Sequence, residues 1–293
     1  MNVFTIKDLE NLSGIKAHTI RIWEQRYNFL KPCRTETNIR YYCSEELKTI
    51  LNISLLNKYG FKISHINRMS DQELRSKIIS LTDTGARQER LINDLIAYMI
   101  EMNVERLDQV LDNYVQTHGI ERAITQIIFP FLHRIGILWI TNHIQPAQEH
   151  LVSNIIRRKL IVGIESVVSI RQVKQTVLLF LPEGEYHELG LIYVHYLLRT
   201  RGARVLYLGA DTTLTDVEFV VKHKRPDLLY THLTSVTGNF SLERFMFQLS
   251  QRLPDIPLVI SGQVVYGYAK KAPKGVNFKR SLPEVLDFVE SLG

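Results

Sequence analysis

Thiols are scarce in this chain of 293 residues, and several other features are missing altogether. Cys33 and Cys43 are the only cysteines, and their spacing is not CxxC, so neither a disulfide framework nor a thiolate zinc site is supported. No apolar run approaches the roughly 18 residues needed to cross a bilayer, and the first ten residues lack the charged-then-apolar order of a signal peptide. Motifs of the forms GxxxxGK[ST], HExxH and GxSxG are also absent, which leaves hydrolase and nucleotidase functions without support. We therefore expect a cytoplasmic protein with no membrane partner.

What the sequence does contain is an ordinary globular composition with an uneven charge. Hydrophobic residues make up 45% and charged residues 23% of a chain that is longer than one core usually serves, so two or three domains are expected. Residues 1–80 hold 13 Lys or Arg against 8 Asp or Glu, which accounts for nearly all of the net charge of +6. Because phosphate neutralisation supplies most non-specific affinity for nucleic acid, this asymmetry favours an anionic partner for the N-terminal part.

The first thirty residues have the spacing of a helix-turn-helix. Thr5 is a plausible N-cap of a short helix that stops at Gly14, and residues 17–27 form a second helix with Ile20 and Trp23 facing inward. Such a second helix lies in the major groove of DNA, where Arg can pair with guanine. The residues expected to face outward are His18, Thr19, Arg21 and Arg26.

A turn-rich stretch at residues 30–42 follows, and its β-prone end fits a wing against the phosphate backbone. The patterns Thr19-Ile20-Arg21-x-Trp23-Glu24-x-Arg26-Tyr27, Pro32-x-Arg34-Thr35 and Arg40-x-Tyr42 resemble the signature of the MerR family. The resemblance implies a winged helix-turn-helix that binds double-stranded DNA as a dimer at a pseudo-palindromic operator. It also implies that Glu24 orients a neighbouring Arg. Asn38 stands where many members have Gly before the wing Arg, and Asn tolerates the left-handed conformation. The DNA-binding residues we expect are His18, Thr19, Arg21, Arg26, Arg34, Arg40, Tyr41 and Tyr42.

Apolar residues recur at helical spacing from 87 to 170, which predicts a four-helix bundle. Within it, nine residues separate Trp139 from the pair Glu149-His150. In isolation this spacing means little, but it resembles the W-x9-E-H motif in the helical cap of CarH-like regulators, where these side chains enclose the adenosyl group of cobalamin. The residue after the Trp is a His in the light-sensing members and Ile140 here, which cannot ligate cobalt, and His143 need not reach the same place.

From residue 175 the pattern alternates between strands and helices, and it predicts a doubly wound parallel sheet of the flavodoxin-like kind. Ligands bind such sheets at the carboxyl ends of the strands. The expected strands are 176–181, 205–208, 228–233, 258–260 and 276–278.

The loop after the first of these strands places Glu185 two residues before His187 and Gly190 three residues after it. An imidazole can ligate a metal while a carboxylate fixes its other N–H, and a glycine lets a helix pass close to a bulky ligand. The segment resembles the E-x-H-x-x-G form of the motif of base-off cobalamin domains, which implies that His187 is the lower ligand of cobalt. By the same resemblance, further cofactor-binding positions are Thr231 and Leu233 in place of the family's S-x-L, and Ser261 and Gly262 in place of its Gly-Gly.

We therefore predict a winged helix-turn-helix at 1–75, a linker at 76–86, a helical cap at 87–170 and a cobalamin-binding Rossmann-like domain at 174–293. The predicted function is a transcriptional repressor, not an enzyme, that is controlled by cobalamin, with adenosylcobalamin as the expected form, bound between cap and sheet. Light is an additional signal if the carbon–cobalt bond breaks productively, and a dimer or tetramer is expected. One alternative is a regulator whose degenerate sensor binds no cobalamin and answers to a protein antagonist. Another is a methylcobalamin carrier of a methyltransferase system.

Overall fold

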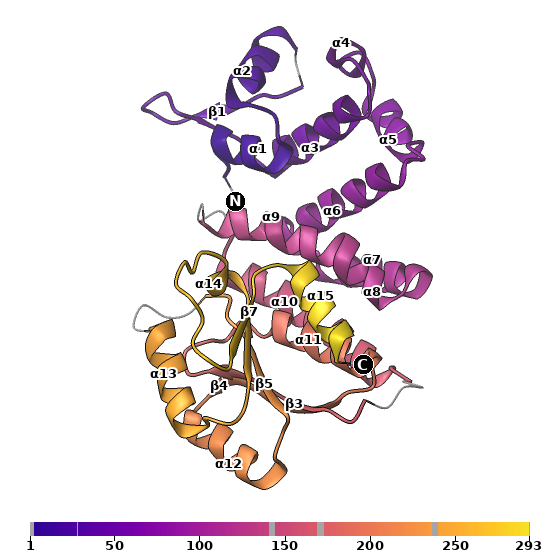
Figure 1. Cartoon of the computed structure of the whole chain (residues 1–293). Helices are drawn as coiled ribbons and strands as arrows, with labels where there is room; N and C mark the ends of the chain where they lie inside the picture. Colours follow the sequence, from indigo (N-terminus) through magenta and orange to yellow (C-terminus); the bar gives the residue numbers. More distant parts are fainter. Residues whose placement is uncertain (1–2, 28, 141–143, 169–172, 236–239, 293) are drawn as a thin grey trace. The chain divides into compact units, whose positions relative to one another are not determined.

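A computed structural model of the chain describes all residues except 1–2, 28, 141–143, 169–172, 236–239 and 293, and the side chains of 137–140 (Figure 1). The chain forms two compact units, Met1–Ile156 and Arg157–Gly293, and the division falls inside helix α10 (Pro146–Glu165). Among the described residues, no helix is long and apolar enough to cross a membrane.

The N-terminal part of the first unit has the expected helix-turn-helix and wing. Thr5 caps α1 by accepting a hydrogen bond from the Asp8 N–H at 3.3 Å, and Gly14 ends the helix with φ of 73°. Ile20 and Trp23 are buried, as predicted from their spacing. The elements are α1 (Ile6–Ser13), α2 (Ala17–Arg26), the antiparallel strands β1 (Cys33–Arg34) and β2 (Arg40–Tyr41), then α3 (Ser44–Lys58), α4 (Ile63–Ile66) and α5 (Asp71–Ile79).

The predicted linker at 76–86 is largely helical, which corrects the sequence interpretation. Helix α5 continues to Ile79 and α6 already begins at Thr84. Residues 80–83 connect the two helices, and the Asp83 carboxylate accepts a hydrogen bond from the Ala86 N–H at 3.0 Å and so caps α6. The winged domain and the helices that follow it therefore belong to one compact unit.

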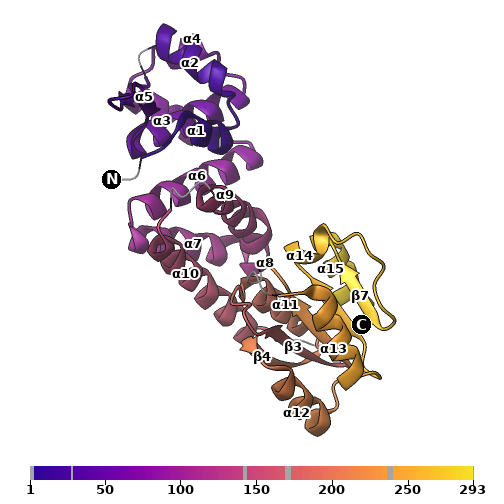
Figure 2. The ribbon, with the colours of Figure 1, turned by 90° about the vertical axis from the view of Figure 1, so that its left-hand side faces the viewer.

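The predicted helical bundle is confirmed (Figure 2). A π-helical turn, η1, lies between α8 and α9 in the third long helix of the bundle. In this turn Gln126 accepts hydrogen bonds from Gln88 at 2.8 Å and from Tyr114 at 3.0 Å. These bonds tie the turn to two neighbouring helices. The elements are α6 (Thr84–Ile100), α7 (Val104–His118), the continuous run of α8 (Ile120–Ala123), η1 (Ile124–Ile128) and α9 (Phe129–Ile140), and α10.

The second unit is a five-stranded parallel sheet in the order β4-β3-β5-β6-β7, as expected of a doubly wound fold. All five predicted strands are present, and β4 is longer than its apolar stretch indicated. The strands are β3 (Thr176–Pro182), β4 (Arg204–Thr212), β5 (Leu228–His232), β6 (Leu258–Ser261) and β7 (Val276–Lys279).

Helices cover both faces of this sheet (Figures 1 and 2). Apolar side chains of α12 and α13 form one core with alternate residues of the strands, such as Leu178, Leu229 and Ile260. Helices α11 and α15 lie on the other face, where the Tyr230 ring stacks on that of Phe288. The helices are α11 (Leu189–Thr200), α12 (Leu214–Lys224), α13 (Leu242–Arg252), the short α14 (Gln263–Tyr266) and α15 (Leu282–Ser291).

Candidate functional sites

Most of the residues predicted to touch DNA are accessible on α2 and the wing. The exposed ones are His18, Arg21, Arg26 and Arg34, and the partly buried ones are Thr19, Arg40 and Tyr41. Tyr42 is fully buried, which differs from the prediction. Its backbone pairs with that of Phe4, and this pairing places the ring in the core of the winged domain. A side chain without exposed surface cannot contact a base or a phosphate.

Glu24 of α2 holds the wing to the recognition helix. Its carboxylate accepts a hydrogen bond from Arg40 Nε at 2.9 Å and another from the Tyr42 hydroxyl. Burial, and next the hydrogen bond to Glu24, raise the pKa of Tyr42, so the hydroxyl remains a donor. The expectation that Glu24 orients an Arg is confirmed. The buried Tyr42 hydroxyl donates to the same carboxylate and so helps to hold it in place. Sequence analysis missed this role because nothing local pairs residues 24 and 42.

The tip of the wing holds Asn38, where the MerR resemblance leads one to expect glycine. Asn38 has φ of 63°, in the left-handed region, as predicted. Its side-chain oxygen accepts a hydrogen bond from Arg34 Nη1 at 2.6 Å, which a glycine could not do. The turn thus survives the substitution and holds one of the arginines expected to meet DNA.

The bundle motif is placed only in part. The backbone of Trp139 lies in the last turn of α9 beside Ile140, but both side chains, and His143, are outside the described residues. Glu149 and His150 start α10, with Glu149 Oε2 at 3.0 Å from His150 Nδ1. The His150 side chain is 71% exposed and that of Glu149 30% exposed, so both can meet a ligand.

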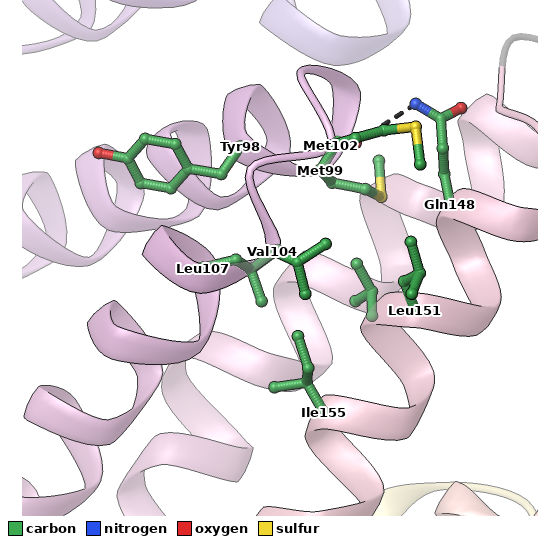
Figure 3. Close-up of a pocket in the computed structure, with 9 residues that line it drawn as sticks. Tyr98, Met99, Met102, Val104, Leu107, Gln148, Leu151 and Ile155 are labelled. Atoms are coloured by element: carbon green, nitrogen blue, oxygen red, sulfur yellow. Dashed lines mark hydrogen bonds between the residues drawn. The ribbon is translucent and has the colours of Figure 1, made fainter.

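The residue before this pair is a structural one that the sequence did not reveal. Gln148 is buried, and its side-chain N–H groups donate to the carbonyls of Met99 at 3.3 Å and Ile100 at 3.2 Å, at the end of α6 (Figure 3). The adjoining pocket between α6, α7 and α10 has a volume of about 10 Å³, which is room for about one water molecule. Gln148 therefore anchors the first turn of α10, and the pocket is too small for an organic ligand.

The loop from β3 to α11 brings Glu185 and His187 together as predicted. Glu185 is fully buried, and its Oε1 accepts hydrogen bonds from His187 Nδ1 at 2.6 Å and from the His187 backbone N–H at 2.9 Å. Its Oε2 accepts from the backbone N–H groups of Thr234 at 2.9 Å and Ser235 at 2.8 Å, just past the end of β5. Burial acts to raise the pKa of Glu185, but the hydrogen bonds from His187 and Ser235 outweigh it and the pKa is lowered.

An ionised Glu185 can only accept hydrogen bonds, so Nδ1 of His187 carries the proton in this pair. In that tautomer Nε2 has the lone pair that a metal ion accepts. The His187 side chain is 57% exposed at the carboxyl edge of the sheet. The geometry is therefore that of an oriented axial ligand. Among the described residues, no group of three or more His, Cys, Asp or Glu side chains could hold a metal ion, so a metal here would have to bring its other ligands with it.

The remaining predicted positions also lie at the ends of the strands. Thr231 is fully buried, and its hydroxyl has no hydrogen-bond partner among the residues that the structure describes. Ser261 Oγ accepts a hydrogen bond from the Tyr230 hydroxyl at 2.7 Å and lies 2.8 Å from His232 Nδ1. Gly262 has φ of 101°, and a Cβ there would lie 2.3 Å from the carbonyl oxygen of Leu233.

Gly190, in the first turn of α11, faces the ring of His232. A Cβ at Gly190 would lie 2.3 Å from both Cδ2 and Nε2 of His232, so a larger residue at position 190 would require this ring to shift. The buried hydroxyl of Thr231, which has no partner among the described residues, is a polar group that a ligand at this edge could satisfy. The residues present fit cobalamin as the ligand. Sequence analysis did not single out His232, because no spacing along the chain links it to Gly190.

The comparisons with known proteins now define the class. A family model described as MerR HTH family regulatory protein matches residues 4–73, and one described as B12 binding domain matches residues 91–162. The chain thus contains a MerR-type helix-turn-helix region and, over its helical bundle, a region that matches a B12 binding domain, in agreement with the resemblance.

Two curated relatives are similar over most of their length. The HTH-type transcriptional repressor CarH of Myxococcus xanthus is 27% identical over 266 residues, 88% of each chain. The repressor CarA of the same organism is 27% identical over 260 residues, 88% of this chain and 85% of its own. Both are transcriptional repressors, which agrees with the role in transcription predicted for this chain. A solved structure, the monomethylamine corrinoid protein of Methanosarcina barkeri, shares the fold with a TM-score of 0.55 at 16% identity, covering 70% of this chain and all of the other.

Proposed function

We propose that this chain is a cytoplasmic transcriptional repressor whose DNA binding is controlled by adenosylcobalamin. The observation that carries the proposal is the buried Glu185 carboxylate, which fixes the ring of His187 through Nδ1 at 2.6 Å. The arrangement agrees with the lower-ligand motif of base-off cobalamin domains and with the repressors to which the chain is similar.

The DNA side of the function uses α2 and the wing of a homo-oligomer. Arginines on α2 would contact base edges or phosphates of a pseudo-palindromic duplex, while the Glu24 clamp keeps the wing in register with the helix. The residues proposed to contact DNA are His18, Thr19, Arg21, Arg26, Arg34, Arg40 and Tyr41.

The sensor side uses the residues of the cofactor motifs. When bound, cobalamin would supply a cobalt centre and an upper organic group, and His187 would hold the cobalt. Glu185 keeps Nδ1 of His187 protonated, so that Nε2 is the ligating atom. Trp139, Glu149 and His150 are proposed for the upper group. The proposed positions for the remainder of the ligand are Gly190, Thr231, Leu233, Ser261 and Gly262.

Ligand and DNA are coupled if binding of the first changes the association of the sensor units, and through it the spacing of the DNA-binding heads. A ligand-dependent tetramer is the proposed assembly. Light is a further signal only if an upper-face ligand other than the residue at position 140 captures cobalt, because Ile140 has no ligating atom.

The test is a visible absorption spectrum of the purified chain after incubation with adenosylcobalamin in the dark and gel filtration. We expect cobalamin to co-elute with a base-off spectrum that His187→Ala abolishes. His223→Ala is the matched control, since that exposed imidazole lies on α12, where its Nδ1 pairs with the Phe219 carbonyl and its ring packs on the Phe219 ring. Colourless protein would contradict the proposal and favour control by a protein antagonist.

A further inference from the structure

The imidazole of His232 occupies the space that Gly190 leaves open. The last residue of β5 sends its ring across to the first turn of α11, where Cδ2 and Nε2 come so close to Gly190 that no side chain fits between them. The ring is held on its other side by Ser261, whose Oγ lies 2.8 Å from Nδ1. The slot at the carboxyl edge of the sheet is therefore filled by the protein's own side chain.

We infer that His232 is a gate for the lower part of a corrinoid, and that it makes this chain select corrinoids by the bulk of their lower substituent. The inference rests on the proposed function. If cobalamin is held by His187, a nucleotide tail that entered the space next to Gly190 would compete there with the ring of His232. A corrinoid that lacks the tail has no such competitor.

The gate is built to move at a modest cost. One hydrogen bond, to Ser261, anchors the ring, and Ser261 keeps the hydrogen bond from the Tyr230 hydroxyl when the ring leaves. His232 is only partly buried, so its ring can reach solvent by rotation about its side-chain bonds. Burial lowers the pKa of His232 to about 4, against a smaller opposing effect of Glu185, so the ring is neutral at pH 7 and no charge must be moved.

The opposite wall of the slot cannot make room in its place. Gly190 is a backbone position in a helix, and Gly262, next to Ser261, is already within contact of the Leu233 backbone, where a Cβ would lie 2.3 Å from the carbonyl oxygen. Tyr230 is fully buried and stacked on Phe288. Of the groups named here, the imidazole of His232 is therefore the one that can move.

The experiment compares two corrinoids on the full-length chain: hydroxocobalamin, which has the nucleotide tail, and cobinamide, which lacks it. Dissociation constants come from visible absorption titrations of the wild type, His232→Ala and the control His223→Ala. Since the gate costs about one buried hydrogen bond and its packing, we expect His232→Ala to tighten cobalamin binding by about tenfold. Cobinamide affinity should stay unchanged in all three proteins.

A second variant guards against misfolding. His232→Asn keeps a polar group near the position of Nδ1 and removes the outer ring atoms, so it should show the same selective gain for cobalamin. An unchanged ratio of cobalamin to cobinamide affinity in both variants would overturn the gate and leave cobalamin binding intact. If neither corrinoid binds to the wild type or to any variant, the proposed function is overturned, and the gate with it.

The contact itself is tested without any ligand. Gly190→Ala should lower the melting temperature of the wild type, because its Cβ would collide with the His232 ring. In the His232→Ala background the same substitution should cost much less, since the colliding atoms are gone. Equal losses in the two backgrounds would show that His232 does not fill the slot in solution.

Discussion

At the scale of the residue, the most informative group is a carboxylate with no exposed surface. Glu185 is ionised inside the C-terminal unit because hydrogen bonds from the side chain and backbone of His187 and from two backbone N–H groups past β5 replace its water. The same bonds fix the imidazole and join the β3 loop to the end of β5. One side chain therefore serves both the fold and the proposed ligand.

The lowered pKa of Glu185 makes a stability prediction with a definite sign. A carboxyl whose pKa falls on folding stabilises the native state above its unfolded value of 4.5, and this contribution is lost as the pH falls through the folded value. We expect Glu185→Gln to lower the free energy of unfolding by about 2 kcal/mol at pH 7 and by less near pH 4.

Urea unfolding of both proteins at the two pH values measures this difference. The exposed neighbour offers a matched control, Glu183→Gln, which should change stability little at either pH. If Glu185→Gln cost the same at pH 4 as at pH 7, the carboxyl would not be held ionised by its partners.

At the scale of the element, the wing is positioned by a contact between α2 and β2. Glu24 is nearly buried and receives both Arg40 and Tyr42, so the two DNA-facing elements move as one. A second contact of this kind ties helices of the bundle to the head. Glu89 of α6 pairs with Arg134 of α9 at 3.5 Å and with Lys58 of α3 at 2.6 Å.

Removing the clamp of the wing should affect both stability and DNA binding. Glu24→Ala leaves the buried Tyr42 hydroxyl without its acceptor, which costs about 1–3 kcal/mol of unfolding free energy. Because Arg40 also loses its partner, the variant should bind more weakly than the wild type to a DNA duplex that the wild type binds. Glu36→Ala, an exposed acidic residue of the wing, is the control. Wild-type stability and DNA affinity in Glu24→Ala would rule out the clamp.

The ion pairs of Glu89 and Glu101 predict unequal losses. Burial lowers the pKa of Arg134 and its pairing with Glu89 opposes this, so Glu89→Gln leaves a poorly solvated cation and should cost about 2 kcal/mol or more. Glu101→Gln breaks only the exposed 3.6 Å pair with Lys48 and should cost less than about 1 kcal/mol. Thermal unfolding of the two variants measures both losses of stability. Equal losses would show that the ion pairs of Glu89 stabilise the protein no more than an exposed pair does.

The sequence predicted what local patterns encode. Helical and strand periodicity placed the helix-turn-helix, the bundle and all five strands, and the two-residue spacing from Glu185 to His187 predicted their hydrogen bond. What escaped it depends on tertiary contacts between distant residues. The burial of Tyr42 follows from its pairing with Phe4, and the contact of His232 with Gly190 exists only once β5 lies next to α11.

At the scale of the whole molecule, one chain contains a winged helix-turn-helix in its first unit and, in its second, the sheet that is proposed to bind the ligand. The two compact units meet in sequence inside α10, whose first turn carries Glu149 and His150 and is anchored by Gln148. Helix α10 is therefore the segment of chain that joins the two units. The proposed coupling of cobalamin and DNA is reciprocal, so each ligand changes the affinity of the other by the same factor.

The most direct test of the account is a titration of the full-length chain against a duplex that it binds, in the dark, with and without saturating adenosylcobalamin. The account predicts that cobalamin changes the DNA affinity by about fivefold or more. It also predicts that DNA changes the cobalamin affinity by the same factor and that His187→Ala abolishes both effects. Identical DNA affinity with and without bound cobalamin would contradict it.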